Sequence, residues 1–201
     1  VLGLPGADAG TLGIVLVAQA IPLLVVLPFG GVIADRVGAA RIIATTDIII
    51  SAVAGTVAVL FITGAVTVPL LAGLSVLTGV LNALWWPAYP ALIPDVVAST
   101  EQLQSANAYL SVASNGGMIV GSAIGGLLVA ALGPGPAIAV DAMSFLLAGL
   151  LVLSMRSVSR PRPSSGSMVD DLAHGWRVVR SIRWFVVVVL AFSVIVMALR
   201  G

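Results

Sequence analysis

The chain contains no cysteine, and its nine basic residues are all arginines because lysine is also missing. The missing cysteine excludes disulfides and thiolate chemistry, and the missing lysine excludes a Walker A loop and a lysine Schiff base. There is one histidine, and the eight acidic residues are spread singly apart from Asp170 and Asp171. We find no nucleophile–base pair or metal-ligand cluster in this pattern, so we predict a protein that is not an enzyme and holds no metal or cofactor.

Charge of either sign is scarce. Charged residues make up 8% of the chain, against roughly 25% in an ordinary soluble domain. The net charge is +1, whereas 60% of the 201 residues are apolar and the mean hydropathy is +1.18. A soluble domain, a disordered chain and a nucleic-acid binder with a basic face are therefore excluded. The composition predicts an integral membrane protein with the lipid bilayer as its first partner.

Long apolar runs predict six membrane spans, each close to the 20 or so residues that a transmembrane helix needs. The runs show no period-2 alternation, so helices are favoured over barrel strands. We therefore expect an all-α helical bundle. The six spans are Leu12–Ala34, Ile42–Thr63, Pro69–Tyr89, Ala108–Leu132, Pro136–Met155 and Trp184–Leu199.

The arginines predict which side each connection faces. Arg36 and Arg41 lie between the first two spans, and six more arginines lie in the connection 156–183. If the spans alternate, both connections face one side, which the positive-inside rule makes cytoplasmic. The uncharged connections Gly64–Val68 and Gly133–Gly135 then face outside. We expect a multi-pass protein of the cell membrane with the loop 156–183 in the cytoplasm.

The same pattern divides the chain into three parts. We expect residues 1–155 to form a bundle of five helices and residues 184–201 to begin a second bundle that continues beyond this sequence. We expect residues 156–183 to form a cytoplasmic linker that is rich in serine and proline at its start and has an amphipathic helix from Asp170. A plain solvated connector is the alternative.

Within the first bundle, we expect a cytoplasmic connection over Ile93–Asn107 in which Ser99 caps the next helix. This orientation places Val1 outside, so we expect one further helix upstream.

A charged motif follows the first span. It consists of Gly31, Asp35, Arg36, Gly38 and Arg41. Gly30 and Gly31 permit a neighbouring helix to approach closely, and Gly38 allows a sharp turn. An acid next to two bases can form an ion-pair network that locks one bundle against another. The alternative is an ordinary tight loop whose arginines only set the orientation.

This motif resembles the signature of the major facilitator superfamily between its helices two and three. All five signature positions match, although Ala39 replaces the usual basic residue after the second glycine. The stretches Pro87–Asp95, Leu103–Ala108 and Ala139–Leu146 resemble the enterobactin-exporter and macrolide-efflux branch. The resemblance implies that the chain covers helices two to seven of a twelve-helix transporter with alternating access.

Glycines recur along one face of the fourth span, where another helix could pack at backbone contact. The pattern resembles the exporter-type motif in helix five of the superfamily, with serine in place of its proline and Ala108 in place of its first glycine. The alternative is a plain close-packed helix pair. The motif residues are Gly117, Gly121, Ser122, Gly125 and Gly126.

Polar and aromatic residues in the spans that line the family's central cavity are candidates for substrate contact. Asn82, Trp86 and Tyr89 share one helix face, which suits a large amphipathic substrate, although an interfacial aromatic belt is the alternative for Trp86 and Tyr89. The full candidate set is Gln19, Asn82, Trp86, Tyr89 and Asn115.

Two acids, Asp47 and Asp141, lie within spans, and we expect them to be buried. A charge at membrane depth is costly, so each has either a structural role or a role in proton coupling.

Taken together, these features predict a proton-coupled secondary transporter that exports drugs or a secreted metabolite and is a monomer when full length. The alternatives are an importer of the same superfamily and a membrane scaffold without transport.

Overall fold

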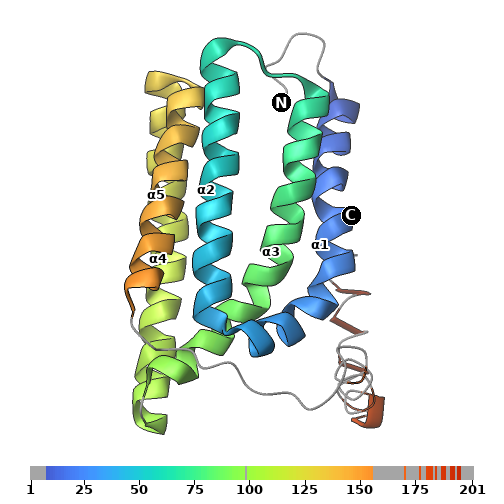
Figure 1. Cartoon of the computed structure of the whole chain (residues 1–201), viewed down its shortest axis with the longest axis vertical. Helices are drawn as coiled ribbons and strands as arrows, with labels where there is room; N and C mark the ends of the chain where they lie inside the picture. Colours follow the sequence, from blue (N-terminus) through green and yellow to red (C-terminus); the bar gives the residue numbers. More distant parts are fainter. Residues whose placement is uncertain are drawn as a thin grey trace. The chain divides into compact units, whose positions relative to one another are not determined.

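The computed structural model describes residues 8–97 and 99–155 continuously, and scattered residues between 170 and 195. The chain divides into two units, 1–162 and 163–201. The first unit contains five helices among its described residues (Figure 1): α1 (Ala9–Val37), α2 (Ala39–Thr63), α3 (Val68–Val96), α4 (Thr100–Leu132) and α5 (Pro134–Ser154). The expected helix from Asp170 and the expected sixth span fall largely outside the described residues.

Each of the five helices is long and apolar enough to cross a membrane. The all-α membrane fold and the first five expected spans are thus confirmed. The helices are longer than the apolar runs because their ends extend beyond the hydrocarbon region that hydropathy detects.

The largest difference from the expectation is at the end of α3. This helix continues through Pro87, Pro90 and Pro94 to Val96, and α4 begins at Thr100. The expected connection over Ile93–Asn107 is therefore wrong, since Val97–Ser99 alone separates the two helices. Proline is tolerated inside membrane helices because neighbouring groups satisfy the carbonyls that it leaves without a donor.

Two helix starts are capped by side chains. The hydroxyl of Ser99 accepts a 3.3 Å hydrogen bond from the Gln102 backbone N–H, which confirms Ser99 as the cap of α4. At the start of α1, the backbone N–H of Thr11 donates a 2.8 Å hydrogen bond to the Asp8 carboxylate. This bond lowers the pKa of Asp8, because it stabilises the ionised form.

The first unit is organised as two packed helix pairs. α1 lies along α3, α2 lies along α5, and contacts between α2 and α3 join the pairs (Figure 1). One buried cluster lies where α1, α2 and α3 meet and is formed by Ala34, Ala39, Ile42, Ile43 and Ala88. α4 packs mainly on α5 and has no buried residue among those described.

Glycines let both pairs approach to backbone contact. A Cβ atom built on Gly30 of α1 would clash with the backbone carbonyl of Ala83, and one on Gly79 of α3 would clash with the carbonyl of Gln19. Between α2 and α5, a Cβ on Gly149 would lie 2.9 Å from Ile48 Cγ1. These pairs could not pack as they do with any larger residue at these positions.

Candidate functional site

The charged motif forms a one-residue junction between α1 and α2. Gly38 alone separates the helices, with φ of 100° and ψ of 128°. Its N–H donates to the Ala34 carbonyl at 2.9 Å, and its own carbonyl accepts from the backbone N–H groups of Arg41 and Ile42, each at 3.1 Å. A side chain is disfavoured in this backbone conformation, so the sharp turn expected at Gly38 is confirmed.

The junction holds the charged members of the motif within two adjacent helix turns. Asp35 and Arg36 lie in the last turn of α1, where Asp35 is exposed and Arg36 is half-buried, and Arg41 is exposed in the first turn of α2. A Cβ on Gly31 would meet nothing within 4 Å, whereas Gly30 beside it packs against α3. The close approach expected from this glycine pair therefore belongs to Gly30.

The glycine face of α4 is open in the described part of the chain. A Cβ on Gly117, Gly121, Gly125 or Gly126 would meet no atom within 4 Å. The Ser122 hydroxyl donates to the carbonyl of Ile119 in its own helix at 2.9 Å. The expected helix-packing role of this motif is thus not seen among the described helices, and the role stays a prediction.

Gly30 was expected to pack closely, whereas Gly79 was missed because it does not belong to a four-residue repeat of glycines. Two equal spacings were a usable signal: Pro22 precedes Gly30 by eight residues, and Gly79 precedes Pro87 by eight. In the structure each proline ring faces the glycine of the other helix, since a Cβ on Gly30 would lie 2.9 Å from Pro87 Cγ, and one on Gly79 would lie 2.9 Å from Pro22 Cγ.

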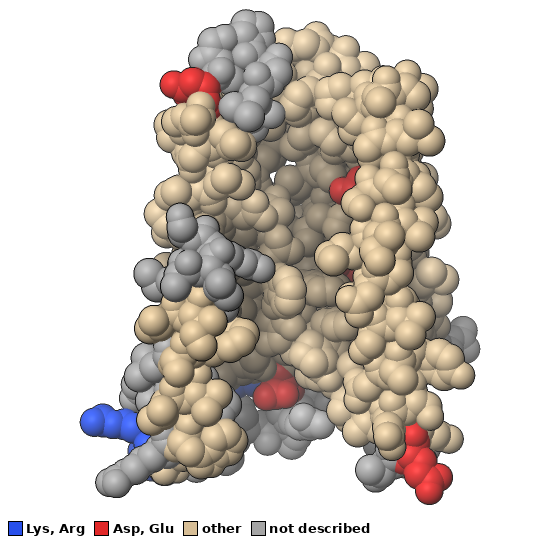
Figure 2. Space-filling view, turned by 180° about the vertical axis from the view of Figure 1, so that it is seen from behind, with Lys and Arg blue, Asp and Glu red and all other residues tan. Residues whose placement is uncertain are grey.

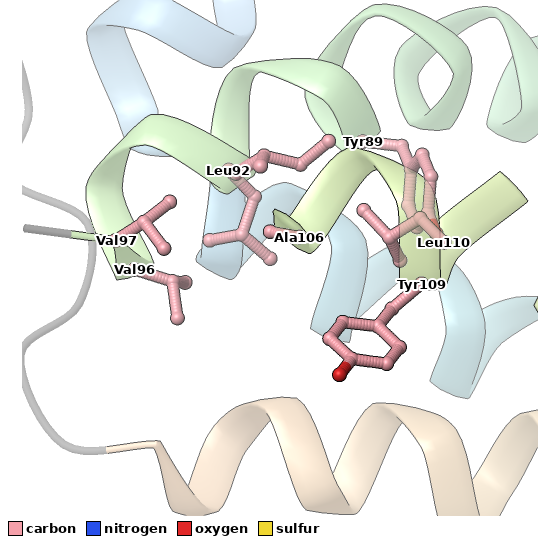
Figure 3. A pocket seen from close by; sticks show the side chains of 8 residues that line it. Tyr89, Leu92, Val96, Val97, Ala106, Tyr109 and Leu110 are labelled. Atoms are coloured by element: carbon pink, nitrogen blue, oxygen red, sulfur yellow. The ribbon is translucent and has the colours of Figure 1, made fainter. Parts of the chain in front are cut away.

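A pocket of about 320 Å³ lies between the end of α3 and the start of α4 (Figure 3). Of the candidate cavity residues, Tyr89 lines this pocket; Gln19 and Asn82 are half-buried elsewhere, and Asn115 folds back onto its own helix by donating to the Ser111 carbonyl at 2.7 Å. The candidate set is therefore not gathered in one cavity. The lining residues are Tyr89, Leu92, Ile93, Val96, Val97, Ala106, Tyr109 and Leu110.

Trp85 of α3 is not in the candidate cavity set, although it contacts two members of that set, Trp86 and Tyr89. Its ring stacks on that of Tyr89, with centroids 4.9 Å apart and planes at 16°. It meets Trp86 edge to face at 6.2 Å. Trp86 itself is 62% exposed. The aromatic group next to the pocket is thus the Trp85–Tyr89 stack. The spacing of four residues between Trp85 and Tyr89 could have predicted this contact, since such residues are neighbours on a helix surface.

The two acids within spans differ in burial. Asp47 of α2 is 4% exposed, while Asp141 of α5 is an exposed side chain. The expectation of burial therefore fits Asp47 and is wrong for Asp141. Figure 2 shows that most of the visible surface of the helical unit carries no charge and that acidic atoms are also present inside the hollow between helices.

These features define the class of the protein. Five apolar helices of membrane length, a charge-poor surface and a charged one-residue junction belong to a polytopic helical membrane protein. No group of three residues that could hold a metal ion is found within the described part of the chain.

Comparison with known proteins identifies the family. The sequence model of the Major Facilitator Superfamily matches residues 4–200, so the chain belongs to this superfamily of transporters. The chain is also similar to the quinolone resistance protein NorA of Staphylococcus aureus (strain MRSA252), with 27% identity over 208 residues that cover 98% of the chain. That alignment covers 47% of NorA, so the chain spans about half the length of this relative. No solved structure matches the chain significantly.

Proposed function

We propose that the full-length protein is a proton-coupled secondary transporter that exports small amphipathic molecules by alternating access. The observation that carries the proposal is the match to the Major Facilitator Superfamily along residues 4–200. Export is favoured over import by the likeness to NorA, whose name describes quinolone resistance. Within the superfamily, the sequence of α3 to α5 resembles the enterobactin-exporter and macrolide-efflux branch, which also favours export.

The substrate class follows from the chemistry of the α3–α4 region. The pocket is lined by aliphatic side chains and two tyrosines, Tyr89 and Tyr109 (Figure 3). The ring of Trp85 stacks on that of Tyr89. Such a surface is suited to apolar and aromatic groups and offers phenol hydroxyls for orientation. A drug or secreted metabolite with a large apolar body fits this chemistry better than a sugar or an amino acid.

The test of export is drug accumulation in cells that lack their own efflux pumps. Cells expressing the full-length protein should accumulate less of a fluorescent amphipathic drug than cells with an empty vector, and collapse of the proton gradient should restore accumulation. Greater accumulation would instead indicate an importer. Unchanged accumulation for a broad drug panel, with the protein present in the membrane, would favour a scaffold.

The orientation leads to a separate prediction. We expect the connection 156–183 to lie in the cytoplasm and Gly64–Val68 to face outside, because eight of the nine arginines then lie on the cytoplasmic side. The chain has no cysteine, so single cysteines can be placed at Val66 and Ser165. An impermeant thiol reagent added to intact cells should label position 66 alone. Labelling of position 165 from outside would reverse the assignment.

A further inference from the structure

Asp47 is a buried acid to which the proposed function assigns no role. It lies in the third turn of α2, and its neighbour Thr46 is also buried. The Thr46 hydroxyl is satisfied within the helix, because it donates to the Ile42 carbonyl at 2.7 Å. Asp47 has no comparable bond within its own helix among the described contacts.

Two neighbouring helices close over this carboxyl group. On the α5 side, a Cβ on Gly149 would lie 3.3 Å from the Asp47 Cβ, so the α5 backbone is in direct contact with the acid's helix. On the α3 side, the indole Nε1–H of Trp85 is buried without a hydrogen bond of standard geometry, and the acceptor that it faces is the Asp47 carboxyl. The acid therefore sits at the point where α2, α3 and α5 meet.

No cation compensates a negative charge at this position. Among the described residues, Asp47 forms no ion pair, and the group that it contacts is the neutral indole of Trp85. Asp141, which shares α5 with Gly149, is eight residues or roughly 12 Å of helix rise away from it. The ionisable side chains on α2 and on the helices packed against it are Asp35, Arg36, Arg41, Tyr89, Asp95 and Asp141.

Burial without a cation disfavours the ionised form of a carboxyl group. The packed arrangement of α2, α3 and α5 therefore favours a carboxylic acid, while any arrangement that admits water to Asp47 favours the carboxylate. Uptake of one proton from water converts the carboxylate to the acid and removes the charge. Proton binding and the packing of the three helices are thus linked.

We propose that Asp47 is a proton-binding site of the transporter and that the Trp85–Tyr89 stack connects its protonation to the pocket between α3 and α4. The indole N–H of Trp85 faces the acid, while the ring of Trp85 stacks on Tyr89, which lines the pocket. A carboxylate would attract the indole N–H and draw Trp85 toward α2. A neutral acid would release the ring to its stacked position. This inference deepens the proposed function, because it names the coupling group.

The first arm of the test measures the proton site without transport. In the full-length protein, all tryptophans except Trp85 are changed to phenylalanine, and Trp85 emission is followed across about pH 5 to 9. We expect a sigmoidal change that Asp47→Asn abolishes. Asp141→Asn, which removes an exposed acid, and Thr46→Val, which removes a buried hydroxyl next to Asp47, should both leave the change in place. An emission that does not depend on pH, or a change that survives in Asp47→Asn, would overturn the proposal.

The second arm measures coupling in proteoliposomes. A gradient of about one pH unit can concentrate a substrate about tenfold per exchanged proton. We expect Asp47→Asn to lose this accumulation while keeping substrate exchange in the absence of a gradient. Gradient-driven accumulation that equals the wild type would refute the role of Asp47 in coupling. If no transport is seen but Trp85 still titrates through Asp47, the proposed function is wrong and the proton site stands.

Discussion

Replacement of Asp35 by asparagine should reduce transport by the full-length protein about tenfold or more, which corresponds to a shift of at least 1.4 kcal/mol in a conformational equilibrium. The substitution keeps the size and the hydrogen-bonding atoms of the side chain and removes its charge. We expect expression and membrane insertion close to those of the wild type. The measurement is drug efflux at matched expression, together with the labelling rate of a single cysteine on the external side.

The physical reason lies in the position of Asp35 within the junction. The carboxylate is in the last turn of α1, where the helix dipole disfavours an anion by up to about 1 kcal/mol. Arg36 in the same turn and Arg41 across Gly38 can compensate it. The resemblance of the motif implies that this charge network stabilises the outward-open state. Without the acid, the arginines repel each other and the external cysteine should be labelled more slowly.

Glu101→Gln is the matched control, because it also removes one exposed acid from the same end of the helical unit. Glu101 lies in the first turn of α4, where the dipole favours an anion. Its loss should change transport by no more than about twofold, as is usual for a surface substitution. Full transport in Asp35→Asn would mean that the motif is an ordinary loop whose arginines only set the membrane orientation.

The second large effect is expected from Gly79→Ala. The added methyl group would overlap the backbone carbonyl of Gln19 and would lie 2.9 Å from Pro22 Cγ. A carbonyl and a proline ring cannot move aside without moving α1, so the α1–α3 pair must separate. Overpacking of this kind costs about 1–3 kcal/mol. We expect a lower yield of monodisperse protein in detergent and a loss of several degrees in Tm.

Gly73→Ala in the same helix is the control for this substitution. A Cβ at Gly73 would meet nothing within 4 Å. It should leave Tm unchanged or raise it slightly, because alanine favours a helix more than glycine does. The reciprocal change Gly30→Ala should reproduce the loss, since its Cβ would overlap the Ala83 carbonyl. Equal stability of Gly79→Ala and Gly73→Ala would disprove the close α1–α3 contact.

The amino-acid sequence by itself determined the class, the family and the positions of the described spans. The hydropathy of a span depends only on its own consecutive residues. The apolar run Ile42–Thr63 therefore predicts α2 without any knowledge of the neighbouring helices. The turn at Gly38 and the cap at Ser99 were equally accessible, because a positive φ and a side-chain cap are local properties. The end of α3 was predicted too early, because the apolar run ends near Tyr89 whereas the helix continues through Pro90 and Pro94 to Val96.

Which helices lie side by side could be learned only from the tertiary structure. Lipid tails and helix interfaces are about equally apolar, so the pattern of apolar residues does not reveal which face of a membrane helix meets a neighbour. For this reason the glycine face of α4 was predicted to pack, whereas Gly30 and Gly79 make the contact. For the same reason Asp47 and Asp141 looked alike in the sequence. Only the packing of α2 between α3 and α5 buries Asp47 against Trp85 and leaves Asp141 exposed.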